Sequence, residues 1–202
     1  MGFYERQVLP RLISLAMRNR ELLPYRARTV SKAAGRVLEI GIGSGLNGRF
    51  YTDRITEVIG IDTNAKLLAT AARQEFRVPV RLILASADAL PLRQAAVDTI
   101  LMTWTLCSIA KVREALEEMH RVLKPNGHLL FVEHGLATDE RVCWWQRRLT
   151  PAWKRLAGGC HLDRPVSVLI ETTGFAMASM ETGYMRGPKP LTFIYEGCAR
   201  PM

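Results

Sequence analysis

Cysteine is scarce in this sequence and occurs in no metal-binding spacing. The four cysteines are Cys107, Cys143, Cys160 and Cys198. None of them forms a Cys-x-x-Cys pair, which would indicate a structural zinc site or a redox motif. Their dispersion also argues against a disulfide framework. We therefore expect reduced, mostly buried thiols and no bound metal.

Long hydrophobic runs are also absent. No apolar stretch reaches the roughly 18–20 residues that a membrane-spanning helix needs. Residues 1–11 do not join a basic start to a long apolar stretch, as a secretory signal does. The sequence has no internal repeat and no evident linker, and its 202 residues suit one domain. We expect a single-domain protein of the cytoplasm.

Acidic residues are sparse at the two ends of the chain. Of the net charge of +9, residues 1–36 contribute +6 and residues 137–202 contribute +3, while residues 37–136 are balanced. A basic segment attracts anionic small molecules, lipid headgroups or nucleic acid. A solvated basic face that aids solubility is the simpler interpretation, and we favour it.

The N-terminal part of the chain predicts two short helices. Residues 4–20 carry apolar side chains at helical spacing opposite several arginines, and Pro10 sets the start of the regular helix near Leu9. A second helix is expected over residues 25–33. We interpret residues 1–35 as a helical lid over the rest of the domain. The alternative is that the first helix makes peripheral contact with an anionic membrane.

From residue 36 onward, predicted strands and helices alternate. Strands are expected near 36–41, 58–62, 80–85, 97–103 and 128–134, and helices near 46–51, 64–75 and 111–123. This alternation is typical of a parallel sheet with helices on both faces. Beyond residue 136 we expect a helix over 163–173 and two antiparallel strands over 175–186 and 190–198. Ligands of such sheets bind beyond the carboxyl ends of the strands.

Residues 36–48 join a short apolar strand to a glycine-rich loop. Gly41, Gly43 and Gly45 follow the strand at alternate positions, and glycine lets the backbone lie close to a ligand because it has no Cβ. Asp62 ends the next apolar strand, where a carboxylate suits two ribose hydroxyls. The alternative role of Asp62 is to cap the helix that follows. The pattern predicts an adenosine-type cofactor.

The loop suits a dinucleotide poorly. Residues 43–48 match G-x-G-x-x-G, but the strand already ends at Gly41, two residues too early. A pyrophosphate seeks helix-terminal N–H groups and gains nothing from Glu39, which lies inside the strand. A cofactor that carries an ammonium group would gain from this carboxylate.

Five motifs resemble, in order, those of class I S-adenosylmethionine-dependent methyltransferases. They are Val37–Gly45, Gly60–Asp62, Ala87–Leu92, Val97–Thr103 and Leu123–Gly127. The resemblance implies an α/β, Rossmann-like sheet of seven strands over residues 36–202, mostly parallel with a C-terminal antiparallel hairpin and with helices on both faces. It also implies S-adenosyl-L-methionine as the cofactor. The residues that it assigns to the cofactor are Glu39, Gly41, Gly43, Gly45, Asn47, Asp62, Thr63, Ala87, Asp88, Ala89 and Thr103, with Asp88 at the adenine amine.

A second resemblance, to the alkyl thiol methyltransferases (methyltransferase type 11 family) and their bacterial relatives, reaches both ends of the chain. Its residues include Glu133-His134, Trp145-Gln146-Arg147, and Gly159-Cys160-His161-Leu162 with Arg164. It implies transfer of a methyl group to a small thiol. Those relatives usually begin with an apolar membrane anchor that this sequence does not show, so we expect no more than peripheral membrane contact.

Thiol methylation sets the chemistry expected on the acceptor side. The attacking group is the thiolate, and with a pKa near 8.5 only a few per cent of a free thiol is ionised at neutral pH. His134, which follows the last parallel strand, is the first candidate for the catalytic base, and His161 is the second. Trp104, Trp145 and Arg164 are expected to bind the acceptor. Structural roles, in backbone hydrogen bonding or in the core, are the alternative for each of them.

Two other functions stay open. One is N-methylation of a lipid headgroup amine of the phosphatidylethanolamine type, and the other is cofactor sensing without turnover. Nucleic-acid methylation is not expected, because Thr103-Trp104-Thr105-Leu106 stands where an Asn-Pro-Pro-Tyr run would be and no recognition domain is added. The oligomeric state is not predicted.

Overall fold

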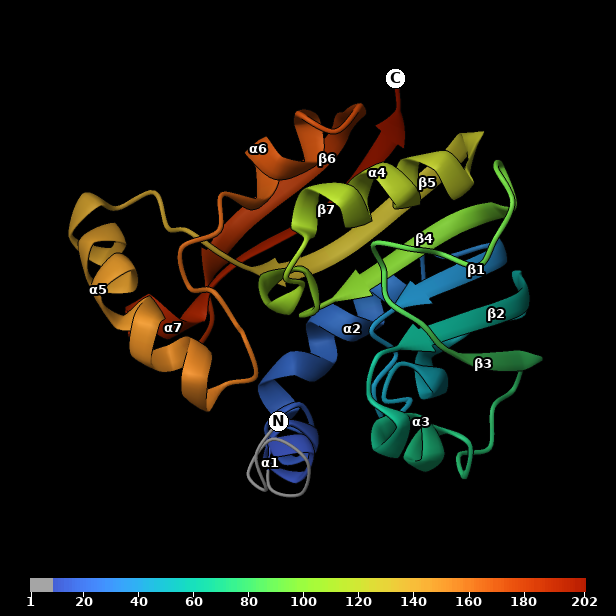
Figure 1. Cartoon of the computed structure of the whole chain (residues 1–202), viewed down its shortest axis with the longest axis horizontal. Coiled ribbons are helices and arrows are strands. Elements are labelled where there is room, and N and C mark those ends of the chain that lie inside the picture. Colours follow the sequence, from blue (N-terminus) through green and yellow to red (C-terminus); the bar gives the residue numbers. More distant parts are fainter. Residues whose placement is uncertain (1–8) are drawn as a thin grey trace.

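A computed structural model describes residues 9–202, without the side chains of Pro10 and Arg11. Seven strands form one sheet in the order β3-β2-β1-β4-β5-β7-β6 (Figure 1). The strands are β1 (Gly35–Ile40), β2 (Ile55–Asp62), β3 (Val80–Leu84), β4 (Val97–Thr103), β5 (Leu123–His134), β6 (Phe175–Tyr184) and β7 (Phe193–Pro201). The first five pair in parallel, and β7 pairs antiparallel with both β5 and β6. The predicted fold class is confirmed.

The helices connect and flank these strands. They are α1 (Leu9–Ala16), η2 (Arg20–Leu22), α2 (Leu23–Val30), η3 (Gly48–Phe50), α3 (Ala65–Ala71), η4 (Leu106–Ser108), α4 (Val112–Val122), α5 (Glu140–Leu156), α6 (Val166–Glu171) and α7 (Lys189–Thr192). The helix predicted from residue 4 is observed from Leu9 to Ala16, and residues 4–8 lie outside the described part of the chain. Residues 48–50 form a 3-10 turn in place of the expected helix.

The main difference from the sequence prediction is α5, which lies in a segment given no secondary structure above. Asp139 caps its N-terminus by accepting hydrogen bonds from the backbone N–H groups of Arg141 and Val142. Pro151 lies inside the helix. Proline is unfavourable inside a helix because it lacks a backbone N–H and its ring clashes with the preceding turn. Its presence in this segment therefore argued against a helix.

The second difference is the start of β5. The strand begins at Leu123, and the predicted turn at residues 124–127 is included in it. The residues of the predicted turn are extra residues in the pairing of β5 with β4. Val97 lies opposite Leu123 and Thr99 lies opposite His128, so the register shifts between these two pairs. The parallel register is regular from Thr99 opposite His128 onward.

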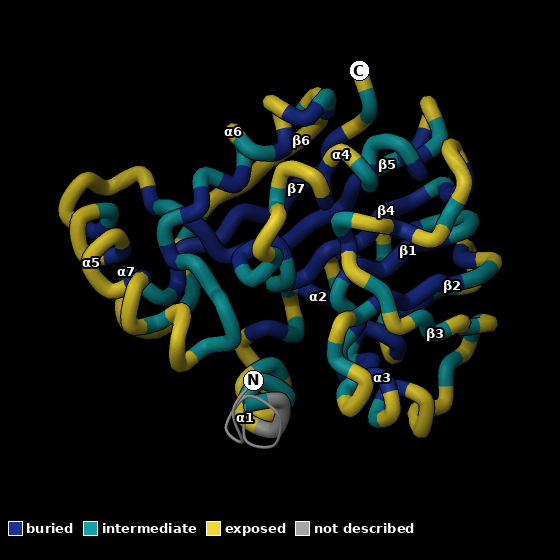
Figure 2. The backbone as a smooth tube through the Cα atoms, viewed as in Figure 1, coloured by how far each residue is buried: buried dark blue, intermediate teal, exposed yellow. Residues whose placement is uncertain are grey.

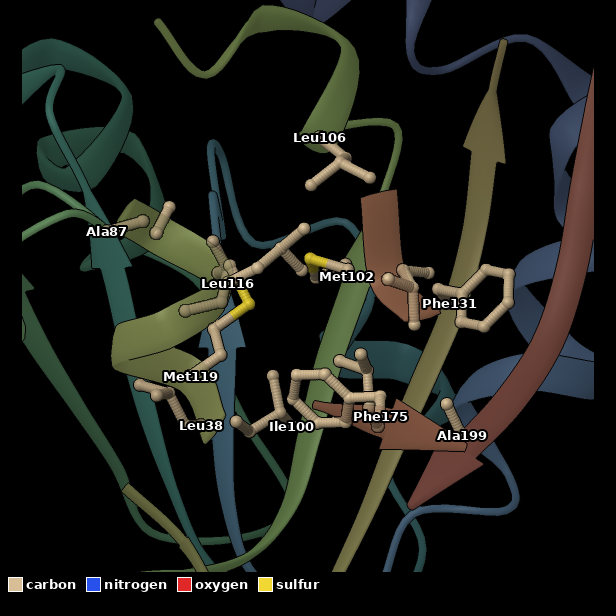
Figure 3. Packing of buried hydrophobic residues seen from close by; sticks show 14 of the residues in the cluster. Leu38, Ala87, Ile100, Met102, Leu106, Leu116, Met119, Phe131, Phe175 and Ala199 are labelled. Atoms are coloured by element: carbon tan, nitrogen blue, oxygen red, sulfur yellow. The ribbon is translucent and has the colours of Figure 1, made fainter. Parts of the chain in front are cut away.

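Both faces of the sheet are covered by apolar packing. On one face, Leu116 and Met119 of α4 pack against Ile100 and Met102 of β4 and Leu38 of β1 (Figure 3). The opposite face buries the alternate residues of the same strands against the N-terminal segment, in a cluster that includes Val30, Val37, Val58, Leu101 and Leu130. Burying a side chain of this size stabilises the fold by about 1.5–3 kcal/mol. This packing on both faces holds in place the strands whose carboxyl ends carry the site residues.

Much of α1 and α5 is exposed (Figure 2), and several of the exposed residues are apolar. On α1, Leu12 is 49% and Leu15 is 70% exposed, so this face of the helix is not packed on the domain. On α5, Trp144 and Leu156 are 48% and 62% exposed. Within residues 9–202, no helix combines the length and the apolar character needed to cross a membrane.

Candidate active site

The carboxyl ends of the parallel strands bring the predicted site residues to one edge of the sheet. The loop at Gly41 follows β1, Asp62 ends β2, Thr103 ends β4 and His134 ends β5. β1 and β4 are neighbours in the sheet, so a ligand at this edge meets residues from several strands.

The glycine loop adopts a backbone that only glycine accepts without strain. Gly41, Gly43 and Gly45 have φ values of +66°, +58° and +78°. A Cβ at Gly41 would collide with the side chain of Thr105, whereas a Cβ at Gly43 would meet nothing nearer than 3.9 Å. The loop is therefore packed on one side and open at Gly43, as a cradle for a bound nucleoside requires.

Asp62 ties β2 to this loop. Its Oδ2 accepts a hydrogen bond of 2.9 Å from the backbone N–H of Gly43, and its Oδ1 accepts one of 2.8 Å from Asn64. Burial raises the pKa of the Asp62 carboxyl, while these backbone donors oppose the shift. Asn64 caps α3 through Lys66 and Leu67, so the alternative interpretation of Asp62 as the helix cap is wrong. Thr63 lies between the two.

A buried polar network fills the space beneath the loop. Arg26 donates to Asn47 Oδ1 at 2.6 Å and to Thr103 Oγ1 at 3.1 Å. Asn47 in turn donates to Glu39 Oε1 at 3.0 Å, and the Tyr51 hydroxyl donates to Glu39 Oε2 at 2.5 Å. Burial raises the pKa of Glu39 to about 7. Glu39, Asn47 and Thr103 thus brace the loop from below.

Two members of this network, Arg26 and Tyr51, are absent from the predicted site residues. Arg26 is only 4% exposed. Arginine is almost never buried without a partner, and the hydrogen bonds to Asn47 and Thr103 provide such partners. Its guanidinium also lies 5.0 Å from the ring centre of Trp104. The sequence contained one usable signal, the position of Arg26 in the short N-terminal helix predicted to lie over the site. Tyr51 offered none, because a tyrosine after a glycine loop is usually part of the core.

The predicted adenine segment follows β3. Asp88 forms an ion pair with Lys111, with 3.2 Å between Oδ2 and Nζ, and also accepts a hydrogen bond from the Ser86 hydroxyl. These hydrogen bonds, first that of Ser86, lower the pKa of Asp88. Ala87 is buried and Ala89 is exposed on either side of it. Asp88 is therefore ionised and able to accept a hydrogen bond from an amine.

Trp104 has a strained backbone at the end of β4. Its φ of +53° is rare for a bulky residue. Strain of this kind costs about 1–3 kcal/mol and often accompanies a functional site. The ring packs edge-on against Tyr25 of α2, and its Nε1 is buried without a hydrogen-bond partner within the described structure. The N-terminal segment therefore covers the residue predicted to bind the acceptor.

Cys107, His134 and Cys160 meet at the end of β5, and we call these three residues the Cys–His–Cys cluster. Their ligand atoms lie within 4.8 Å of one another, and Cys160 Sγ is 3.7 Å from His134 Nδ1. Hydrogen bonding to Cys107, and then to His134, lowers the pKa of the Cys160 thiol to about 5. His134 is 6% exposed and its Nε2 has no hydrogen-bond partner within residues 9–202. The sequence spacing of 27 and 26 residues gave no hint of this cluster.

Glu133 and Arg164 surround the cluster. Glu133 is fully buried and accepts a hydrogen bond of 2.9 Å from the backbone N–H of Thr105, while burial raises its pKa to about 8. Arg164 donates to the carbonyl oxygens of Leu106 and Ile109, both at 2.5 Å, and so holds η4 in place.

The remaining two predicted residues lie further out. His161 is close to Asp163, with 3.7 Å between Nδ1 and Oδ1, and burial lowers its pKa. Its backbone N–H donates to Cys107 O at 2.9 Å. Trp145 is 52% exposed on α5, where its ring packs edge-on against Trp144. It is not part of the buried group around His134.

This fold and loop define a class, the S-adenosylmethionine-dependent methyltransferases, and comparison with known proteins agrees. The model of a methyltransferase domain family matches residues 38–131. The chain is 32% identical to the thiol S-methyltransferase TMT1B of Homo sapiens over 175 residues, which cover 82% of this chain and 69% of that protein. It is 34% identical to TMT1B of Rattus norvegicus over 72% of this chain and 62% of that protein. The chain therefore belongs to the S-adenosylmethionine-dependent methyltransferases, and S-adenosylmethionine is its cofactor.

The chain spans about two thirds of the length of these relatives. Solved structures support the fold at lower identity. A S-adenosylmethionine-dependent methyltransferase from Mesorhizobium loti superposes with a TM-score of 0.69 at 20% identity, over 90% of this chain and 98% of that one. The YcgJ protein of Bacillus subtilis gives a TM-score of 0.63 over 81% of this chain and 72% of that one, also at 20% identity.

Proposed function

We propose that this methyltransferase transfers a methyl group to the sulfur of a small thiol. The observation that carries the proposal is the match to thiol S-methyltransferases over 72–82% of the chain. An imidazole and two thiols at the end of β5 give the acceptor side a chemistry suited to sulfur. The alternative of a lipid headgroup amine has no comparable support.

The residues of the chain divide between cofactor and acceptor. S-adenosylmethionine supplies, when bound, a methyl group on a positively charged sulfur. The loop at Gly43 and the Asp62 carboxylate would hold the nucleoside, and Asp88 would accept a hydrogen bond from its adenine amine. Glu39 and Asn47, which are hydrogen-bonded to each other, support the glycine loop. Methyl transfer needs no enzyme nucleophile, so the chain contributes mainly orientation and exclusion of water.

Formation of the thiolate is the step that the acceptor side assists. An acceptor thiol must lose its proton before its sulfur attacks, and His134 contributes to that loss. Trp104 and α2 form the apolar side of the proposed acceptor site. They would keep water away from the reacting sulfur. Arg164 keeps η4 fixed, and His161 orients the loop that carries Cys160.

Replacement of His134 tests whether this residue acts on the acceptor and not on the cofactor. His134→Ala should lower turnover of a thiol by about 10²-fold or more, the usual contribution of a group that assists proton transfer. Affinity for S-adenosylhomocysteine should stay within a few-fold, because the imidazole lies on the acceptor side. Steady-state kinetics and titration calorimetry measure the two quantities. His128→Ala, in the middle of the same strand β5, is the matched control. Unchanged turnover in His134→Ala would remove this residue from the mechanism.

We also propose that the protein acts in the cytoplasm with α1 and α5 against an anionic membrane surface. Leu12 and Leu15 on α1, and Trp144 on α5, expose apolar surface. Arg148 lies over the Trp144 ring, with 4.2 Å from its guanidinium carbon to the ring centre, and supplies positive charge beside that surface. Exposed aromatic and basic side chains together suit the interface of an anionic bilayer.

A further inference from the structure

The Cys–His–Cys cluster is built from three distant parts of the chain. Cys107 lies in η4, His134 ends β5, and Cys160 lies in the loop between α5 and α6. Within residues 9–202 it is the one group of three or more His, Cys, Asp or Glu side chains whose ligand atoms converge in this way. It contains two sulfur ligands and one nitrogen ligand, a set that suits zinc.

The backbone fixes this convergence. Gly158 and Gly159 have φ values of +62° and +86°, so the chain reverses direction immediately before Cys160. A Cβ at Gly159 would lie 3.4 Å from the carbonyl oxygen of Ser108, the last residue of η4. The His161 N–H then bonds to Cys107 O. The loop therefore lies close to η4 at Gly159 and is hydrogen-bonded to it next to Cys160.

The separations fit a tetrahedral ion. Zinc bound by sulfur at about 2.3 Å and by nitrogen at about 2.0 Å holds two such ligand atoms roughly 3.5 Å apart. The observed distance from Cys160 Sγ to His134 Nδ1 is 3.7 Å. All three atoms lie within 4.8 Å of one another, so adjustments of about 1 Å bring them to bonding distance. Two thiolates and a neutral imidazole also balance the charge of a divalent ion.

Three protein ligands leave one position of a tetrahedral ion free, as catalytic zinc sites do. The cluster adjoins the predicted acceptor side, because η4 begins two residues after Trp104 and Thr105 packs against Gly41. Cys160 is half-buried, so one member of the cluster retains contact with solvent. We infer that Cys107, His134 and Cys160 bind a zinc ion whose fourth position takes the acceptor thiol.

The reaction balances with this ion present, and this part of the inference rests on the proposed function. Coordination releases the proton of the acceptor thiol to solvent and leaves a zinc-bound thiolate. A new carbon–sulfur bond forms as the sulfonium carbon–sulfur bond breaks, and its electron pair stays on the sulfur of S-adenosylhomocysteine. The methyl thioether then leaves the ion, which is neither oxidised nor reduced. His134 then assists the loss of the acceptor proton through the ion that it ligates.

Metal content tests the site directly. The protein is incubated with zinc, freed of unbound ion and analysed for zinc per chain. We expect close to one ion in the native protein, at least a fivefold loss in Cys107→Ser and in Cys160→Ser, and no loss in Cys198→Ser, whose residue lies on β7. Binding of S-adenosylhomocysteine verifies that each variant is folded. Equal, low zinc in all four proteins, or a Cys107–Cys160 disulfide in the freshly purified protein under reducing conditions, would overturn the inference.

Cobalt substitution tests the acceptor position. The native protein loaded with Co²⁺ should show thiolate-to-cobalt charge transfer and the visible bands of a tetrahedral ion, and a small thiol should shift those visible bands. Absence of a shift would overturn the assignment of the fourth position. If the metal-free protein methylates thiols at the native rate, the zinc inference fails and the proposed function stands. If zinc binds as expected and no thiol is methylated, the proposed function fails and the metal site stands.

Discussion

Asp62 is the residue on which we expect cofactor binding to depend most directly. Its carboxylate joins the end of β2 to the open part of the glycine loop through Gly43. A hydrogen bond to a charged group contributes about 1.5–3 kcal/mol, which corresponds to roughly 10–150-fold in affinity. The residue was recognisable from the sequence because it ends an apolar strand at a fixed distance from a glycine loop.

Asp62→Ala should therefore weaken binding of S-adenosylhomocysteine by at least tenfold. The substitution removes the acceptor of the Gly43 N–H and the predicted partner of the ribose hydroxyls. Titration calorimetry measures the change, with Asp53→Ala, at an exposed position, as the control. Equal affinity in the two variants would show that Asp62 does not contact the ribose.

Glu39 should make the stability of the protein depend on pH. Burial raises its pKa from 4.5 to about 7. The folded state therefore favours the protonated carboxyl, and this contribution is fully present below pH 4.5 and is lost as the pH rises to about 7. A shift of this size corresponds to roughly 3 kcal/mol.

Glu39→Gln should accordingly lose less stability than the native protein between pH 5 and pH 8. The amide cannot ionise, so its buried side chain carries no cost at high pH. Urea unfolding at both pH values gives the two differences in free energy. The same fall in both proteins would contradict a raised pKa for Glu39.

At the scale of elements, the sequence predicted the strands and α4 well because their apolar residues follow regular periods. The glycine loop and Asp62 were predictable for the same reason, since each is placed by the end of a strand. Helix α5 was missed because Pro151 and its exposed tryptophans hide any single apolar face. The Cys–His–Cys cluster was missed because tertiary contacts alone bring its residues together, and the expectation of no metal site rested on local spacing.

The exposed faces of α1 and α5 carry a prediction of their own. Leu15→Glu and Trp144→Glu should each reduce binding to vesicles that contain anionic lipid, because each replaces an exposed apolar contact with a negative charge. Val168→Glu, at a position of α6 that is 52% exposed, is the matched control. Vesicle co-sedimentation at low and at physiological salt measures the effect. Equal sedimentation of the three variants would contradict a membrane-facing role for these helices.

At the scale of the whole molecule, the site lies between two segments that contact it from opposite ends of the chain. Helix α2 reaches the loop through Arg26, and the segment after α5 reaches η4 through the His161 N–H and Arg164. The parallel sheet presents its carboxyl ends between them. Because both segments contact the sheet edge at which the cofactor and the acceptor are expected to meet, we expect them to limit the access of water to the reacting groups.

Turnover with labelled S-adenosylmethionine tests the central claim most directly. The purified protein is offered panels of small thiols, amines and phenols, and the products are identified by mass spectrometry. The account predicts methyl thioethers from thiols, with turnover strongly reduced in His134→Ala and retained in His128→Ala. Methylated amines or phenols with no methyl thioether, or tight cofactor binding without turnover of any acceptor, would contradict it.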